Sequence, residues 1–227
     1  MKLVYQGKTK NVYELDGDKC LLEFKDDVTG ENGRIDPGAN FVLGKLEGKG
    51  RMALAMSKHF FDLLKEKNIP SHYIDADLEK NTMTVKKAET FGHGLEIVCR
   101  FKAYGSFLRR YGLYAKEFQP LDALVEITLK DDNRGDPLIN DETLVQLNLL
   151  SNSEIDAIKK IARQVAEIVR EDLARLGLEL VDIKFEFGRV DKQIVVIDDI
   201  SSDNMRVFKD RAPVPPKDLA LLVTAGQ

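Results

Sequence analysis

The chain has 227 residues, of which 43% are hydrophobic and 32% are charged, with a formal net charge of −4. This composition excludes a disordered chain, and the small negative charge argues against nonspecific nucleic-acid binding. The length allows one large domain or two small lobes. No signal peptide is recognised and no apolar run reaches the roughly 18 residues that cross a bilayer, so we expect a cytoplasmic protein. Cys20 and Cys99 lie far apart in apolar surroundings, which favours buried, reduced thiols.

The amino-terminal stretch predicts antiparallel strands at residues 3–5, 11–15 and 19–25. The first bend between them contains a glycine and two lysines, Lys8 and Lys10. Glycine lets the backbone approach an anion closely, and ammonium groups neutralise phosphate charge, so this bend is a candidate phosphate site. A solvated hairpin turn is the alternative, because the bend lacks the spacing of a Walker A loop.

Residues 26–50 are rich in glycine and polar residues, which predicts a functional or disordered loop without regular structure. A helix is expected near residues 51–67, with apolar side chains along one face and Pro70 beyond its end. Further strands are expected at residues 71–75, 82–88 and 95–103. Residues 86–94, between the last two, are a candidate hinge between lobes.

Residues 100–110 pass from a strand through Gly105 and Ser106 into a short helix. Free N–H groups and the helix dipole attract anions at a helix amino terminus, so Ser106 together with Arg100 is a candidate phosphate site. An ordinary capped helix is the alternative. After a strand at 123–130 and a polar turn, the longest helix is expected at residues 153–176.

The densest group of charged residues is a predicted hairpin near the carboxyl end. On its first strand, residues 181–188, alternation places three charged side chains on one face: Asp182, Lys184 and Glu186. The second strand, residues 194–197, ends at Asp198 and Asp199. Mg²⁺ usually keeps waters and phosphate oxygens beside one or two carboxylates, so this hairpin could hold a metal-bound triphosphate. The alternative is an amphipathic hairpin whose charged face meets water.

Several fragments occur in one order across nearly the whole chain: Gly7–Lys10 with Val12, Phe24–Asp27, Glu47–Gly50, Val85–Lys87, Arg100 with Gly105 and Ser106, Lys130–Asp132 with Gly135–Asn140, Asp182–Gly188, and Asp198–Ser201 with Asp203 and Arg206. No single fragment is decisive. As an ordered set they resemble the SAICAR synthetases, the phosphoribosylaminoimidazole-succinocarboxamide synthases of purine biosynthesis.

The resemblance implies a two-lobed α+β fold related to ATP-grasp and kinase-like enzymes, with antiparallel sheets and flanking helices. It implies a β-rich nucleotide-binding lobe at residues 1–91 and an α+β lobe at residues 92–227 that carries the ribotide and metal sites. The implied ligase joins L-aspartate to the carboxylate of carboxyaminoimidazole ribotide, using ATP and Mg²⁺ and releasing ADP and phosphate. No nucleic-acid or membrane partner is implied, and a homodimer is left open.

The resemblance also implies which residues form the site. The ATP-binding residues are Lys8, Lys10, Val12, Lys86, Ala88, Thr90, Lys130, Glu186 and Asp198, of which Glu186 and Asp198 are also the Mg²⁺ ligands. The ribotide-binding residues are Arg100, Ser106, Lys184, Asp203 and Arg206. The catalytic residues are Lys184, Asp182 and Asp136. These groups position substrates and neutralise charge, which agrees with the lack of a nucleophilic Ser, Cys or His constellation.

The chain departs from the family pattern in three places. Phe101 and Tyr104 change polarity and bulk beside the implied ribotide site, residues 30–48 form a longer loop, and the tail after Arg206 does not align with the family's basic segment and final helix. Two further readings therefore remain beside the leading one. The first is a paralogous ATP-dependent ligase for another amine or carboxylate. The second is a noncatalytic nucleotide-binding protein of the same fold.

Overall fold

The computed structural model describes residues 1–31, 34–35 and 41–225. The chain is divided into two units: unit 1 contains Met1–Glu89, Gly188–Asn204 and Pro215–Gln227, and unit 2 contains Thr90–Phe187 and Met205–Val214. The first boundary falls within the segment that we expected to be a hinge. The division differs from the predicted one further along the chain, because two segments of the predicted second lobe pack with unit 1.

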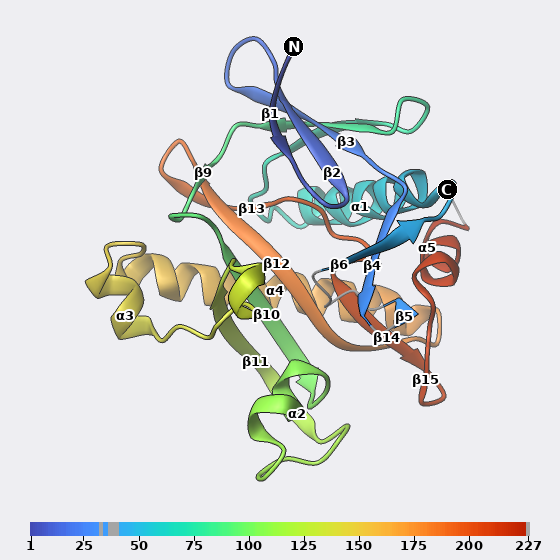
Figure 1. Ribbon diagram of the computed structural model, residues 1–227, viewed down its shortest axis with the longest axis vertical. Helices are drawn as coiled ribbons and strands as arrows, with labels where there is room; N and C mark the ends of the chain where they lie inside the picture. The colour runs from blue at the N-terminus through green and yellow to red at the C-terminus, as the bar shows by residue number, and fades with distance from the viewer. Residues whose placement is uncertain (32–33, 36–40, 226–227) are drawn as a thin grey trace. The chain divides into compact units, whose positions relative to one another are not determined.

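Unit 1 is built on an antiparallel sheet with the strand order β1, β2, β3, β8, β7, of which β1, β2 and β3 are labelled in Figure 1. Its strands are β1 (Lys2–Gln6), β2 (Lys10–Glu14), β3 (Lys19–Phe24), β7 (Tyr73–Asp77) and β8 (Thr82–Lys86). The three strands predicted at the amino terminus are confirmed. The strand β13 (Gln193–Ile197) also belongs to unit 1, where an isolated β-bridge joins Val196 to Ser71. The returning segment thereby brings the acidic residues after β13 into unit 1.

Two helices pack together in unit 1, α1 (Lys49–Glu66) and α5 (Pro216–Thr224). The apolar stripe predicted for the first helix is confirmed: Leu54, Phe60 and Leu64 are fully buried. Pro216 starts α5, where its missing N–H costs no helical hydrogen bond. The tail after Arg206, which we did not align from the sequence, therefore contains a helix.

The prediction that residues 26–50 lack regular structure was wrong. An antiparallel sheet forms there from β4 (Asp27–Glu31), β5 (Arg34–Ile35) and β6 (Phe41–Lys45). Glycines inside β4 and β6 hide the strand pattern, because glycine is usual in turns. The Asp26 carboxylate accepts hydrogen bonds from the N–H groups of Gly48 (3.1 Å) and Gly50 (2.9 Å), so it caps the start of α1. Residues 36–40 of the predicted longer loop lie outside the described residues.

Unit 2 is built on a second antiparallel sheet, in which β10 lies between β11 and β12 and β14 follows β12. The strands of this sheet are β9 (Glu89–Thr90), β10 (Leu95–Lys102), β11 (Pro120–Leu129), β12 (Glu179–Val190), β14 (Met205–Lys209) and β15 (Ala212–Pro213), of which Glu89 and residues 188–190 belong to unit 1. Its helices are α2 (Ser106–Tyr111), the 3₁₀ turn η1 (Asp132–Arg134), α3 (Asp141–Gln146) and α4 (Asn152–Arg175). The expected α+β architecture, with antiparallel sheets and flanking helices, is confirmed.

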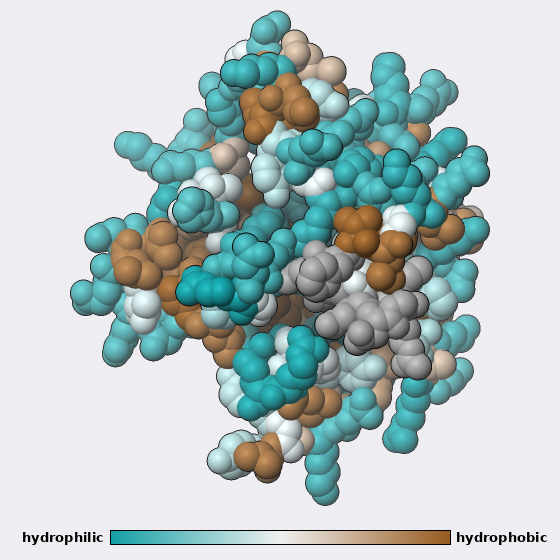
Figure 2. Space-filling view, viewed as in Figure 1, coloured by the Kyte–Doolittle hydropathy of each residue, from teal (hydrophilic) through white to brown (hydrophobic). Residues whose placement is uncertain are grey.

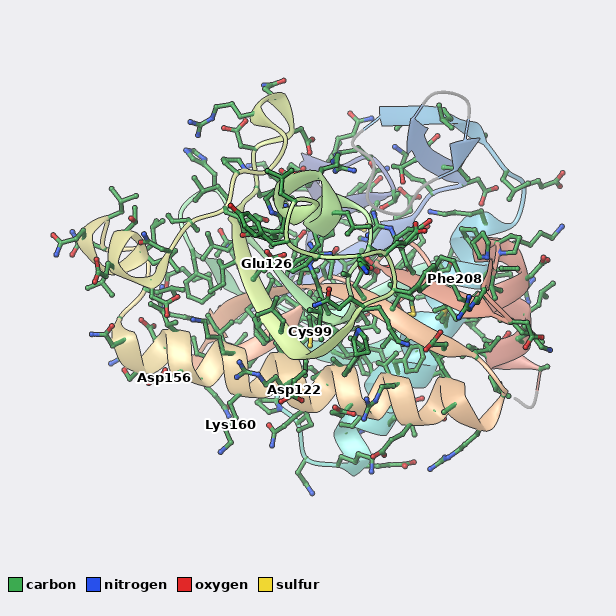
Figure 3. The ribbon with its side chains drawn as sticks, turned by 90° about the horizontal axis from the view of Figure 1, so that it is seen from below. Cys99, Asp122, Glu126, Asp156, Lys160 and Phe208 are labelled. Carbon is green, nitrogen blue, oxygen red and sulfur yellow. The ribbon has the colours of Figure 1, made fainter. Side chains whose placement is uncertain are left out.

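The helix α4 covers one face of this sheet and leaves the other face to polar side chains. Ser151 and Glu154 form a capping box that starts the helix, and its buried apolar stripe packs on β10 and β11. In β10 the residues Ile97 and Cys99 are fully buried on that side. Figure 3 shows Cys99 on the α4 side of the sheet and Glu126 on the opposite side. Alternation along the strands therefore separates the core from a charged face.

Both thiols are free and buried, as predicted from the sequence. Burial raises the pKa of the Cys99 thiol to about 12 and also raises the pKa of Cys20. Because the thiolate is the reactive form, we expect neither cysteine of the native protein to react with an aromatic disulfide reagent at about pH 8. Both should react after unfolding in guanidinium chloride. Rapid stoichiometric labelling of the native protein, followed by absorbance, would contradict this expectation.

The edge strand β1 exposes apolar side chains. Leu3, Val4 and Tyr5 are all exposed, and Figure 2 shows hydrophobic side chains at the surface over this strand. The homodimer left open by the sequence remains a prediction.

Among the described residues, no helix combines the length and the apolar character needed to cross a bilayer.

Candidate active site

In unit 1, the acidic end of β13 meets the start of β2 at Lys10. The Lys10 Nζ lies 3.1 Å from Asp198 Oδ1 and also forms an ion pair with Asp199. Asp199 accepts a further hydrogen bond from the hydroxyl of Ser201. The Asp199 side chain is 1% exposed and the Asp198 side chain is 26% exposed. Asp199 is therefore committed to internal contacts, whereas Asp198 is the carboxylate that a ligand could reach.

The Lys10 ammonium remains charged in this setting. Burial acts to lower its pKa, but Asp198 and Asp199 act in the opposite direction and leave the pKa above its ordinary value. A buried ammonium next to two carboxylates makes this corner of unit 1 a compact arrangement of fixed charges.

The bend before Lys10 is shaped by Lys25, a residue that sequence reasoning did not assign to the site. Its Nζ donates to the carbonyl oxygens of Gly7 and Lys8, each at 3.1 Å. A Cβ at Gly7 would lie 2.8 Å from the carbonyl oxygen of Lys10, so only glycine fits there. The sequence feature that could have pointed to Lys25 is its position at the end of the third predicted strand.

The remaining ATP-binding candidates lie on strands β2 and β8 and on the segment after β8. Val12 is half-buried on β2 and Lys86 is exposed at the end of β8, and both strands pair with β3. Ala88 is half-buried beyond β8. Thr90 is exposed, and its hydroxyl donates to the carbonyl oxygen of Gly92 at 3.3 Å. Thr90 already belongs to unit 2.

Asp203, assigned from the resemblance to the ribotide, lies in unit 1 and forms an ion pair with Lys49. Burial raises the pKa of the Asp203 carboxyl, while Lys49 acts to lower it. The pair lines a cavity of about 60 Å³ that also contacts Met52 and Pro216. This space is enough for a few water molecules.

On the polar face of unit 2, two lysines pair with two glutamates. Lys130 Nζ lies 2.5 Å from Glu186, and Lys184 Nζ lies 2.6 Å from Glu96. Glu96 stands opposite Glu186 in the register of β10 and β12, so the four charges are neighbours. Burial acts to lower the pKa of Lys184, but Glu96 and Glu186 outweigh it and the pKa is raised. Lys184 is therefore a cation held in place by its neighbours.

Further along the same face, Arg100 is the centre of a buried network. Its Nε donates to Glu126 at 2.6 Å, its Nη1 to Asp182 at 2.9 Å and its Nη2 to Ser106 at 2.9 Å. Arg206 Nη1 donates to the same Asp182 carboxylate at 3.0 Å. Arg100 is 2% exposed. The structure thus brings four ribotide or catalytic candidates together and makes Arg100 the internal organiser among them.

Glu126 was missed by sequence reasoning, although alternation along the strand at 123–130 could have placed it on this face. The Nη2 of Arg110 donates to Glu126 at 2.6 Å, beside Arg100. Three guanidinium groups, those of Arg100, Arg110 and Arg206, therefore meet two carboxylates, those of Glu126 and Asp182. The cluster carries one surplus positive charge, which suits an anionic ligand.

Asp136 has a conformational role in the turn after β11. Its backbone lies in the left-handed region at φ 50°, and its carboxylate accepts a hydrogen bond from the N–H of Asp131 at 2.9 Å. These contacts fix the polar turn that follows Lys130.

Glu186 belongs to unit 2 and Asp198 to unit 1, so their convergence on one metal ion stays a prediction.

Two departures from the family pattern have different consequences. Phe101 is buried, and its ring contacts the guanidinium of Arg170 on α4. Phe101 therefore lies on the face of the sheet opposite to Arg100. Tyr104 contacts the ring of Phe208 edge to face, and its ring centroid lies 6.0 Å from the Arg206 guanidinium carbon. Only Tyr104 therefore touches the charged cluster.

Gly105 is required by its backbone and by Arg206. It has φ 54° and ψ −125°, and a Cβ there would lie 3.0 Å from the guanidinium carbon of Arg206. We expect Gly105→Ala to lower the free energy of unfolding by about 1–3 kcal/mol, because of the backbone strain, and to weaken anion binding at Arg206. Gly177→Ala is the matched control, since Gly177 has φ 70° with nothing within 4 Å. Binding of inorganic phosphate, measured by calorimetry, should weaken only in the Gly105 variant.

The fold and these charged clusters define a mixed α+β protein built to bind anionic small molecules. A family model described as SAICAR synthetase matches residues 3–218. A phosphoribosylaminoimidazole-succinocarboxamide synthase from Clostridium tetani is 53% identical over 225 residues, which cover 98% of this chain and 99% of that protein. The chain belongs to the SAICAR synthetase family.

Solved structures agree with this membership. A SAICAR synthetase in complex with ADP is 34% identical with a TM-score of 0.82, and the match covers 92% of this chain and 86% of that one. A SAICAR synthetase from Pyrococcus horikoshii is 30% identical with a TM-score of 0.83, and the match covers 96% of this chain and 98% of that one. The family predicted from the ordered fragments is thereby confirmed.

Proposed function

We propose a residue-level account of the SAICAR synthetase activity of this chain. The enzyme joins L-aspartate to the carboxylate of carboxyaminoimidazole ribotide and converts ATP to ADP and phosphate, a ligase step of purine biosynthesis. The observation that carries the account is the charged face of unit 2, where Asp182, Lys184 and Arg206 lie with Arg100 and Ser106. Such a face combines a surplus positive charge with fixed hydrogen-bond donors.

For the ribotide, we assign its phosphate to Arg206 and Ser106. Arg100 is buried, so its contribution is to hold Asp182 and Ser106 in position and to add positive charge behind them. A bidentate guanidinium recognises a phosphate well, and its planar donors are already oriented here by Asp182. For Asp203, the ion pair with Lys49 holds its carboxylate in place, and its contact with the ribotide stays a prediction.

For the chemistry, we assign Lys184 to the reacting carboxylate. A carboxylate is a poor electrophile, and transfer of a phosphoryl group from ATP would convert it to an acyl phosphate that the amine of aspartate attacks. Lys184 would neutralise the carboxylate and the charge that develops during both steps. Asp182 holds the arginines, and Asp136 holds the turn beside Lys130, so both act on the geometry of the site.

For the nucleotide, we assign the phosphates of ATP to the bend at Lys8 and Lys10 and to Lys130, and adenine to the chain from Lys86 to Thr90 with Val12. We assign Mg²⁺ to Glu186 and Asp198, because hard divalent cations take carboxylate oxygens and phosphate oxygens. In the described part of the chain no three acidic, histidine or cysteine side chains are grouped to hold a metal alone, which agrees with an ion that depends on phosphate ligands. When bound, Mg²⁺ would neutralise charge on the triphosphate.

The second candidate function is a paralogous ligase that uses another amine or carboxylate. It is favoured by one observation, the bulky Tyr104 against Arg206. The cytoplasmic location and the lack of nucleic-acid and membrane partners expected from the sequence remain predictions.

Release of ADP tests the proposal, with carboxyaminoimidazole ribotide and L-aspartate present together or each omitted. We expect ADP release to require ATP, Mg²⁺ and both substrates. Turnover that requires a different amine or carboxylate would favour the paralogous ligase, and ADP binding without turnover would contradict both ligase functions.

A further inference from the structure

His72 occupies a fixed position between two strands of unit 1. It precedes β7 and is 4% exposed. Its backbone N–H donates to the carbonyl oxygen of Val196 on β13 at 2.9 Å, and its own carbonyl oxygen accepts from the N–H of Lys86 on β8 at 2.7 Å. The imidazole contacts the ring of Phe61 at a centroid distance of 5.8 Å. Neither the backbone nor the ring of His72 therefore has room to move independently of these strands.

The imidazole makes one polar contact with the segment after β13. Its Nε2 lies 3.0 Å from the backbone carbonyl oxygen of Asp198. A carbonyl oxygen can only accept, so Nε2 carries the hydrogen and donates it. His72 thereby holds the peptide group that joins Asp198 to Asp199.

This peptide group controls where two consecutive carboxylates point. Asp198 has φ 65°, a left-handed conformation that non-glycine residues adopt at a cost. Its side chain is 26% exposed, while the side chain of Asp199 turns inward to Lys10 and Ser201. If the peptide group rotated, the two carboxylates would change direction together. A donor on its carbonyl oxygen opposes that rotation.

We propose that His72 is a positioning residue for Asp198, whose carboxylate it aims toward Mg²⁺ by donating from Nε2 to the Asp198 carbonyl oxygen. This inference depends on the proposed function, in which Asp198 is a Mg²⁺ ligand. His72 itself touches neither the metal nor a substrate in this role.

Two variants of nearly equal shape test the donor itself. His72→Gln keeps an N–H near the position of Nε2, whereas His72→Met has similar length and no donor. ADP binding to the purified protein is measured by calorimetry over a series of Mg²⁺ concentrations, with no turnover involved. We expect the Mg²⁺ concentration for half-maximal ADP binding to rise about 3- to 10-fold in the methionine variant, the effect of one lost hydrogen bond, and to stay near the wild-type value in the glutamine variant. The affinity for ADP without Mg²⁺ should be equal in both.

Equal Mg²⁺ dependence in the two variants would overturn the role of His72, whatever their melting temperatures. If the methionine variant does not fold, His72→Asn replaces it, because its shorter amide does not reach the Asp198 oxygen. Asp198→Asn separates this inference from the proposed function. Unchanged Mg²⁺ dependence in that variant removes Asp198 as a metal ligand, and the role of His72 with it. Loss of Mg²⁺ dependence in Asp198→Asn but not in the methionine variant removes only the role of His72.

Discussion

Replacing Lys184 with methionine is expected to reduce turnover at least about a hundredfold while the protein remains folded. The reason is the loss of one fixed cation next to developing negative charge, which typically costs about 2.7–4 kcal/mol in the transition state. Methionine retains the apolar length of the side chain and removes only the ammonium group. The measurement is kcat from ADP release at saturating ATP, ribotide and aspartate.

Lys102→Met is the matched control for this experiment. Lys102 lies on β10, in the same sheet as Lys184, and forms an ion pair with Glu179 at 2.9 Å. The side chain of Lys102 is 27% exposed, and that of Lys184 is 28% exposed. It has no assigned role in the site, so its turnover should stay within about twofold of wild type, as for an exposed ion pair. Near-normal turnover in Lys184→Met would remove Lys184 from the mechanism.

Replacing Arg100 with methionine is expected to lower the free energy of unfolding by about 3–5 kcal/mol, because two buried carboxylates each lose a hydrogen bond from a charged donor, an interaction worth about 1.5–3 kcal/mol. The groups left behind are Glu126 and Asp182, which are both buried. Equilibrium unfolding in urea, followed by circular dichroism, measures the loss. The variant should also bind ribotide poorly, since Ser106 and Asp182 lose the group that holds them.

Arg110→Met provides the contrast, because Arg110 donates to the same Glu126 oxygen as Arg100. The Arg110 side chain is 27% exposed, so we expect a loss of only about 0–1 kcal/mol. Similar losses in the two variants would show that burial does not set the cost, and would argue against Arg100 as the organiser of the network.

Most of the helices and strands, and the membership of the family, could be predicted from the sequence alone. Alternation placed Asp182, Lys184 and Glu186 on one face of a strand, and the apolar period gave α1 and α4 nearly at their observed bounds. These are local properties, set by the geometry of a single strand or helix. The ordered fragments added the candidate residues, because each fragment retains its own short spacing.

Which charged side chains pair with one another became visible only in the folded protein. Glu96 and Glu126 became partners of Lys184 and Arg100 through the register of β10, β11 and β12, and His72 met Asp198 across 126 residues of chain. The strands at 27–45 were also missed, because their pairing depends on register and on glycines that look like turns when read alone. Strand register is set by contacts between residues far apart in sequence, and burial follows from it. That is why Arg100 could be proposed as a site residue from the sequence, whereas its position inside the protein could not be predicted.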